Sequence, residues 1–222
     1  MRGTRPRRIF LSCIAALSLA VLFSAGSPLS VSGADFTVDT IQKAYENIRD
    51  IKGGFVQKST IKDLKKTDTF EGTFMIKVPS KMRWQYRGEG KEMEVIVNSG
   101  EMTVYQKSEK QVLRGGFDKD SYGQAPLALI GGFANIEKEF DVAKKKGRLL
   151  LTPKKNMGMV ASVEISPSEG EFPIGSLTII DKRSNRIEII FREVVLNSGI
   201  SDSAFSFSVP PGVSVYEHTR PH

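Results

Sequence analysis

Residues that could carry out covalent chemistry are few in this chain, and they do not combine into a catalytic pattern. The two histidines, His218 and His222, both stand at the C-terminal end, and the one cysteine is Cys13. The sequence contains no Gly-x-Ser-x-Gly elbow, no phosphate-binding loop and no His-Glu-x-x-His motif. We therefore expect no enzymatic activity, no cofactor and no metal site.

Two carboxylate pairs, Glu92 with Glu94 and Glu137 with Glu139, are the remaining candidates for acid–base chemistry. Glu92 and Glu94 share one face of an expected strand, because side chains two residues apart in a strand point the same way. We interpret both pairs as solvated surface. The short lysine run at residues 144–146 is interpreted as a solvated turn or edge strand.

The first 34 residues have the layout of a cleavable secretory signal peptide. Four arginines precede an apolar run at residues 9–23, and small residues follow up to Ala34. The run is short for a membrane span, so an uncleaved anchor is the less favoured alternative. We expect cleavage after Ala34, with Ala25 and Gly26 as alternative sites. Cys13 fits a lipoprotein attachment signal poorly and is interpreted as part of the apolar run.

Residues 35–222 are expected to form one domain with a sizeable core, since no linker or repeat interrupts them. They hold 28 basic and 25 acidic residues, a net charge of +3. The basic residues are spread among the acidic ones, so we do not expect nucleic acid as a partner. Without Cys13 this part of the chain has no disulfide and no thiol nucleophile.

The residues that could hold a ligand are apolar, and they are concentrated in residues 70–86. Large apolar side chains alternate with polar ones at residues 70–77 and again at residues 82–86, which predicts two half-buried strands. Pro79 lies between them and lacks the N–H that a continuous strand needs. Such strands place Phe74, Met82 and Trp84 on a sheet surface that is either a packed core or the lining of an apolar cavity.

A helix is predicted over residues 35–50, because Ile41, Ala44, Tyr45 and Ile48 form one apolar stripe. Thr37 or Asp39 is expected to cap it, and Gly53-Gly54 to end it. A second, short helix is expected at residues 125–130, where a proline suits the first turn.

Most of the remaining sequence predicts short antiparallel strands. Residues 98–100, Asn-Ser-Gly, are expected to form a hairpin turn. In the strand over residues 186–196, Ile187, Ile189, Phe191 and Val195 are expected to share a face. A last strand is expected within residues 205–213, with a frayed tail from Glu217. The other strand patterns cover residues 54–61, 93–97, 102–106, 111–113, 140–145, 148–152, 160–166 and 176–181.

These elements predict the α+β class, with a curled antiparallel sheet of about ten or eleven strands covered by helices. Their order resembles the family of periplasmic lipoprotein carriers of Gram-negative bacteria, the LolA family, over nearly all of residues 35–222. The resemblance rests on six short motifs: Phe55-x-Gln57; Pro79 followed by Met82-Arg83-Trp84-x-Tyr86; the Val97–Gly100 turn with a strand to Tyr105; the segment Pro126–Ile130; Leu151–Lys154; and Phe205-x-Phe207-x-x-Pro210-Pro211-Gly212-Val213.

The resemblance implies an incomplete, half-open β-barrel closed by a helical lid. It also implies a periplasmic, monomeric carrier that takes acylated lipoproteins from an inner-membrane ABC transporter and delivers them to an outer-membrane receptor. The residues expected to line the acyl-chain cavity are Phe74, Met75, Met82, Trp84, Leu127, Leu129 and Ile130. The residues expected on the lid helix are Ile41, Tyr45 and Ile48.

One position departs from the family pattern. Well-studied members carry an arginine immediately before the proline, where it holds the lid shut, and this chain has Val78 before Pro79. No latch role is carried over to Arg83. We expect apolar contacts of Leu127, Leu129 and Ile130 to hold the lid instead.

Other functions remain open at this point. The same half-barrel fold serves outer-membrane lipoprotein receptors and periplasmic sensors that bind lipid or lipoprotein. A receptor needs a lipidated N-terminus, which Cys13 does not provide, and a sensor usually brings a further domain. A structural domain with a packed core is the plainest alternative. A lipid-modifying enzyme is disfavoured by the missing nucleophile and base.

Overall fold

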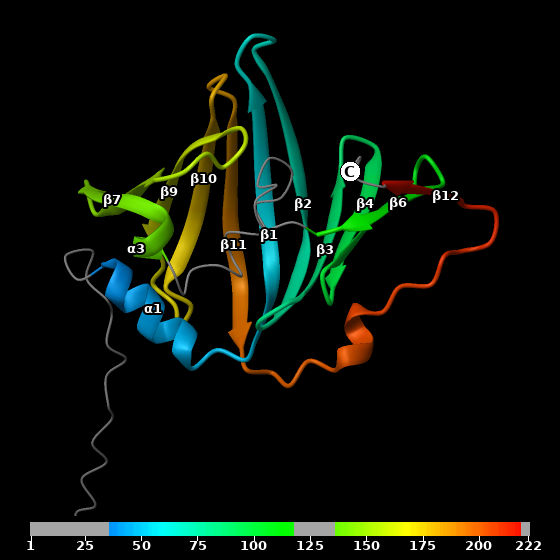
Figure 1. Ribbon diagram of the computed structural model, residues 1–222, viewed down its shortest axis with the longest axis horizontal. Coiled ribbons are helices and arrows are strands. Elements are labelled where there is room, and N and C mark those ends of the chain that lie inside the picture. The colour runs from blue at the N-terminus through cyan, green and yellow to red at the C-terminus, as the bar shows by residue number, and fades with distance from the viewer. Residues whose placement is uncertain (1–35, 118–135, 219–222) are drawn as a thin grey trace, which may run out of the picture.

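The computed structural model describes residues 36–117 and 136–218 (Figure 1). The predicted signal peptide with its cleavage sites, and the helix expected at residues 125–130, lie outside these ranges. The described residues form one sheet of twelve strands, two short α-helices and a 3-10 helix. None of these helices is long and apolar enough to cross a membrane.

The bounds of the elements agree with the strand patterns of the sequence at most positions. In chain order the elements are α1 (Val38–Glu46), β1 (Asp50–Ile61), β2 (Lys66–Lys77), β3 (Lys81–Gly88), β4 (Lys91–Asn98), β5 (Glu101–Gln106), β6 (Gln111–Gly116), α3 (Ile136–Glu139), β7 (Phe140–Lys145), β8 (Arg148–Pro153), β9 (Val160–Pro167), β10 (Ile174–Asp181), β11 (Arg186–Leu196), the 3-10 helix η2 (Asp202–Phe205) and β12 (Ser214–His218).

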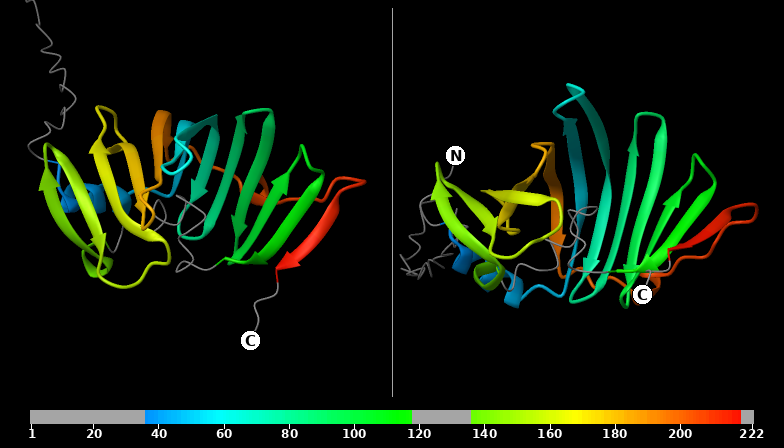
Figure 2. Two further views of the ribbon diagram at one scale, coloured as in Figure 1. Left: turned by 90° about the horizontal axis from the view of Figure 1, so that it is seen from above. Right: turned by 45° about the horizontal axis from the view of Figure 1, so that its top comes forward.

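The strands lie in the order β12-β6-β5-β4-β3-β2-β1-β11-β10-β9-β8-β7. Neighbouring strands are antiparallel except at one edge, where β12 runs parallel to β6. The sheet curls without closing, with β7 and β12 at its two ends (Figure 2). This confirms the expected curled and unclosed sheet and corrects the expectation of purely antiparallel pairing.

The alternation of apolar and polar residues predicted correctly which side chains of the central strands are buried. In β3, Met82, Trp84 and Tyr86 are buried, whereas the residues between them are more exposed. The hairpin between β4 and β5 turns at Ser99 and Gly100, whose φ angles are 53° and 85°. Two successive left-handed residues match the twist of the flanking strands, which is why this turn joins adjacent antiparallel strands.

The N-terminal helix is shorter than predicted. Thr37 caps it as expected, by accepting a hydrogen bond from the backbone N–H of Thr40. The helix ends at Glu46, so the expected stop at Gly53-Gly54 was wrong. Those glycines lie inside β1, where a Cβ on Gly53 would come within 2.9 Å of the Arg192 carbonyl oxygen.

A β-bulge in β11 changes which side chains face the core. The register between β1 and β11 shifts between Lys52 and Gly54, opposite Glu193, which has a φ of 49°. Beyond the bulge the faces are exchanged. Val195 is therefore 48% exposed, and it does not share a face with Phe191 as predicted; Val194 and Leu196 pack against the core instead.

Residues 197–213, called the strap below, run from the end of β11 past the lower ends of the central strands and then up to β12 at the edge of the sheet (Figure 1). The strand expected within residues 205–213 is absent from the strap, and the last strand is β12, which includes Glu217. Lys77 and Lys81 both form ion pairs with Asp202 in the strap, at 2.6 and 2.9 Å. These two lysines lower the pKa of Asp202 to about 2, so the pairs persist in mild acid.

Asp50 fastens the start of the strap. Its buried carboxylate accepts hydrogen bonds from the backbone N–H groups of Ser198, Gly199 and Ile200 and from the Ser198 hydroxyl. Burial alone would raise the pKa of Asp50, but the four hydrogen bonds outweigh it and hold the pKa below its usual range.

Replacing Asp50 by alanine is expected to destabilise the protein by about 2–3 kcal/mol, because three backbone donors lose their acceptor. Since the pKa is lowered in the folded state, the charged carboxylate stabilises above a pH of about 4, and this contribution is lost as pH falls below it. Urea denaturation at pH 7 and at pH 3.5 should show the difference in stability between wild type and Asp50→Ala shrinking in acid. A difference that does not change with pH would contradict this role.

Candidate functional site

The face of the sheet that carries the main hydrophobic core is called the inner face. Its centre is a continuous row of aromatic rings, called the aromatic wall: Phe55 on β1, Phe74 on β2, and Trp84 and Tyr86 on β3. Ring centroids are 4.7 Å apart for Phe55–Trp84 and 4.9 Å for the stacked pair Phe74–Trp84. These contacts contribute beyond the apolar area that they bury.

Gly72 makes room for the aromatic wall. It lies between Phe55 and Tyr86 in the strand register. A Cβ at this position would come 1.7 Å from the Gln85 carbonyl oxygen and 3.1 Å from the Phe55 ring. The glycine therefore lets β3 approach β2 closely and lets the Phe55 ring lie over the backbone.

The structure brings together three of the predicted cavity residues and separates a fourth. Phe74, Met82 and Trp84 are all buried on the inner face. Met75 pairs with Lys52 and Arg83 on the opposite, outer face, because it follows Phe74 in a regular strand. Its inclusion in the cavity was wrong, and the alternation in the sequence already indicated this. The other three predicted residues, Leu127, Leu129 and Ile130, lie outside the described residues.

The helix α1 lies beside the half of the sheet formed by β7–β11 (Figure 1). Ile41 is fully buried in the hydrophobic core, and Ile48 is buried after the end of the helix rather than on it. Tyr45 contacts Phe172 at 6.1 Å between ring centroids, and Phe172 contacts Phe191. The aromatic contacts thus continue from the wall to α1, since Phe191 also contacts Phe74.

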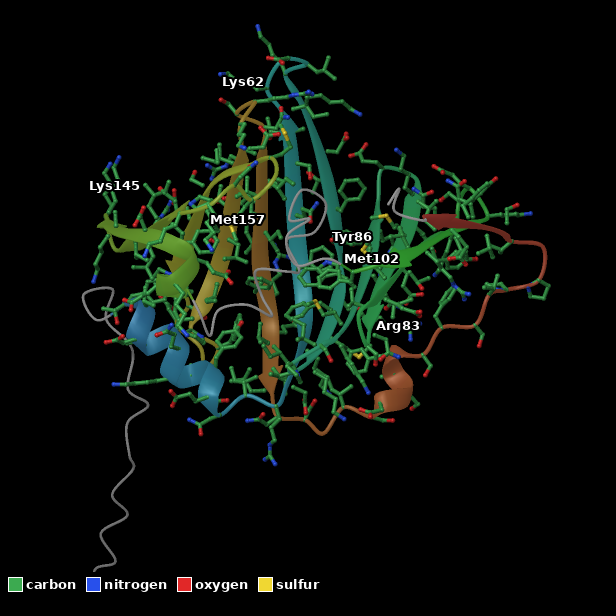
Figure 3. All side chains as sticks on the ribbon, in the orientation of Figure 1. Lys62, Arg83, Tyr86, Met102, Lys145 and Met157 are labelled. Atoms are coloured by element: carbon green, nitrogen blue, oxygen red, sulfur yellow. The ribbon has the colours of Figure 1, made fainter. Side chains whose placement is uncertain are left out.

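The inner face is less covered toward β4, β5 and β6. Met93, Met102 and Val104 lie there by the strand register, packed against the core but only partly buried. Figure 3 labels Met102. Methionine is flexible and polarisable, so it adapts to ligands of variable shape. This group of three residues is called the apolar margin. The inner face is thus a packed core at its centre and an incompletely covered apolar surface at this margin.

Two polar atoms within the inner face lack a hydrogen-bond partner among the described residues: the Trp84 Nε1–H donor and the Gln57 Oε1 acceptor. Trp84 has an exposed fraction of 0%. Buried polar atoms without partners are few in native proteins and call for a physical reason. Tyr86 is buried nearby, and burial raises the pKa of its hydroxyl, which keeps the wall uncharged.

The outer face carries a polar network that sequence reasoning missed. Arg83 Nε lies 2.5 Å from Glu94 Oε1, and the same oxygen accepts from Gln85 Nε2 at 2.8 Å. Arg83 Nη1 also donates to the carbonyl of Ala204 in the strap, at 2.7 Å. Glu94 is 4% exposed, so its interpretation as solvated surface was wrong. Glu92, its neighbour on β4, is exposed and pairs with Lys107, as expected of a solvated face.

Comparison with known proteins identifies the family to which this chain belongs. Residues 46–208 match the family model described as outer membrane lipoprotein carrier protein LolA. The outer-membrane lipoprotein carrier protein of Cupriavidus pinatubonensis is 28% identical over 219 residues, covering 94% of this chain and 98% of its own. That of Neisseria meningitidis serogroup C is 29% identical over 203 residues, covering 87% and 94%.

Among solved structures, an uncharacterized conserved protein from Thermus thermophilus superposes with a TM-score of 0.50 at 9% identity, covering 82% of this chain and 96% of its own. This likeness concerns the fold alone. The family match covers the aromatic wall, the apolar margin and most of the strap, and it confirms the resemblance seen in the sequence. This chain therefore belongs to the outer membrane lipoprotein carrier protein family, LolA.

Proposed function

We propose that this protein binds the acyl chains of lipoproteins on its inner face and carries them across the periplasm to the outer membrane. The observation that supports this is the apolar margin, which extends a buried aromatic wall across an unclosed sheet. An acyl chain could lie along Met93, Met102 and Val104 without unfolding the packed centre. Relatives across nearly the whole chain are named as lipoprotein carriers, not as enzymes.

The energetic need for such a carrier follows from the cargo. Burying a CH₂ group gains about 0.8 kcal/mol, so one chain of roughly 16 carbons gains on the order of 10 kcal/mol when it leaves water. A lipoprotein therefore does not cross an aqueous compartment unaided. Release of the cargo at the outer membrane requires that the favourable free energy of burying its acyl chain be partly offset. The cost of displacing the side chains that cover the inner face during binding supplies part of that offset.

We further propose that the Trp84 N–H donor becomes a polar contact for the cargo once the side chains that cover the aromatic wall are displaced. Acyl chains are attached through ester or amide groups, whose carbonyl oxygens accept hydrogen bonds. A donor held ready in an apolar wall has no competing partner among the described residues. The proposed partners are acylated lipoproteins as cargo, an inner-membrane ABC transporter as donor and an outer-membrane receptor as acceptor, with the carrier acting as a monomer after removal of the signal peptide.

Native mass spectrometry of the protein from a periplasmic extract tests the proposal. We expect bound acylated lipoprotein on the wild type. Met102→Asp should lower the bound fraction on the order of tenfold, because the new carboxylate lies where the acyl chain would pack. The matched control is Thr103→Asp on the outer face of the same strand, which should load normally. Equal loading of the two variants would contradict the proposal. So would a wild-type protein that carries no lipoprotein under conditions in which lipoproteins are released from the inner membrane.

A further inference from the structure

The hairpin between β1 and β2 projects beyond the rest of the sheet (Figures 1 and 3). The two strands pair along their whole length, from Asp50 with Lys77 to Ile61 with Lys66. Pairing between β2 and β3 stops at Glu71 with Arg87. Gly88, the last residue of β3, still lies against Thr69 and Phe70. Residues 66–68 of β2 therefore extend beyond β3, an overhang of roughly 10 Å at about 3.3 Å per residue.

The tip of this hairpin exposes large apolar side chains. Leu64 is 68% exposed, the highest value among the large exposed hydrophobic residues of the described chain, and Ile61 is 40% exposed. Neither residue belongs to the core. Exposed leucine and isoleucine on a projecting turn cost solubility and contribute little to the fold, which points to a contact with an apolar partner.

Basic side chains surround these two residues. Lys62 and Lys65 make no ion pair with any described carboxylate, and Lys66 pairs with Asp68. The adjacent turn between β10 and β11 adds Lys182 and Arg183. The two turns are joined by a hydrogen bond from the Lys62 backbone N–H to Asn185 Oδ1, at 3.0 Å. Five basic side chains thus stand against four acidic ones, Asp63, Asp68, Asp181 and Glu89, the last of which acts on Lys66. One of the five, Lys182, also donates a hydrogen bond to Asn156 Oδ1 at 2.9 Å.

We propose that the tip of the β1–β2 hairpin docks on an anionic phospholipid membrane, with Leu64 and Ile61 inserted among the headgroups and the surrounding lysines paired with lipid phosphates. Lysines near an anionic bilayer surface each favour partitioning by about fivefold, and the lysine stems extend along the membrane boundary. A protein partner suits the tip less well, because stable protein interfaces bury about 800 Å² per partner, more than a six-residue turn offers.

A fluorescent label tests insertion directly. Without its signal peptide the chain has no cysteine, so Asp63→Cys can carry one environment-sensitive nitrobenzoxadiazole group beside Leu64. We expect a blue shift with vesicles of 70% phosphatidylcholine and 30% phosphatidylglycerol, and none with pure phosphatidylcholine. The matched control is Ser99→Cys, in the turn between β4 and β5. An unshifted label at residue 63, or equal shifts at both positions, would overturn the proposal.

Binding to sucrose-loaded vesicles of the same composition gives the strength of docking. Leu64→Asp should weaken sedimentation with anionic vesicles about tenfold, and Lys62→Gln with Lys65→Gln on the order of tenfold. The controls are Val195→Asp and Lys52→Gln, exposed residues near the other end of β1, which should change binding less than twofold. A normal near-ultraviolet circular dichroism signal from buried Trp84 confirms that each variant is folded.

The outcomes separate this proposal from the carrier function. The vesicle experiments use protein without cargo, so their failure leaves the binding of lipoproteins untouched, and loss of cargo binding leaves the hairpin result untouched. Binding that is insensitive to Leu64→Asp would overturn the proposal. Binding of an acidic protein through the tip, without any binding to vesicles, would also overturn the proposal and would make the tip a protein-docking site.

Discussion

Replacing Trp84 by alanine is expected to lower the free energy of unfolding by about 4 kcal/mol, the largest effect of any single substitution considered for this protein. Trp84 is fully buried and contacts Phe55, Phe74 and Tyr86. Its removal leaves a cavity in the middle of the aromatic wall, and β2 and β3 cannot close over it without breaking their register. Urea denaturation measures the loss.

Trp84→Phe separates the packing of the ring from its N–H donor. The phenyl ring keeps most ring contacts, and the lost donor has no hydrogen-bond partner among the described residues, so stability should change by no more than about 1 kcal/mol. If the donor binds a cargo carbonyl, this variant should release acylated cargo about fivefold more readily. Unchanged cargo retention by Trp84→Phe would leave Trp84 a packing residue only.

Arg83→Met is expected to destabilise the protein by about 3 kcal/mol, because it leaves the Glu94 carboxylate buried without its cation. The strap also loses the donor to its Ala204 carbonyl, so the amides of Ala204 and Ser206 should exchange with solvent faster. Urea denaturation and hydrogen exchange followed by mass spectrometry provide the two measurements.

The control for this prediction joins β4 to the turn after β5. Lys107 and Glu92 form an ion pair whose side chains are 47% and 53% exposed, so Lys107→Met should cost less than about 1 kcal/mol. Combining Arg83→Met with Glu94→Leu should recover much of the lost stability, since no charge then remains buried. An Arg83→Met variant as stable as Lys107→Met would show that the network does not secure the strap.

The central strands were predictable because their signal is local. Met82, Trp84 and Tyr86 face the core by alternation alone, and Asn98-Ser99-Gly100 specifies its own turn. The residue types in β11, by contrast, do not indicate where its β-bulge lies. Glu193 adopts a positive φ that nothing in its chemistry favours, and this shift moves Val195 to the outside.

The residues of the candidate site were predicted only where a local pattern determines their burial. The aromatic wall follows from strand alternation, but the polar network of Arg83 and Glu94 also includes the strap, where the Ala204 carbonyl that accepts from Arg83 lies 121 positions later in the sequence. No local pattern contains that contact. Three of the misassigned residues, Met75, Glu94 and Val195, differ in cause. The assignment of Met75 neglected the period-two rule, whereas those of Glu94 and Val195 failed because their burial depends on tertiary structure.

The strap also has a mechanical consequence for the sheet. The strap begins at the end of β11, near the centre of the sheet, and ends at β12, on the edge of the sheet. It therefore braces strands β1–β6 from outside. Asp50, Lys77, Lys81 and Arg83 fix it at successive points along that brace. Within residues 36–117 and 136–218, the strap forms no hydrogen bond or ion pair with β7–β10, and this half joins the rest of the sheet through β10 and β11. We therefore expect the braced side to resist bending, and the β7–β10 side to widen more readily when a bulkier guest is admitted.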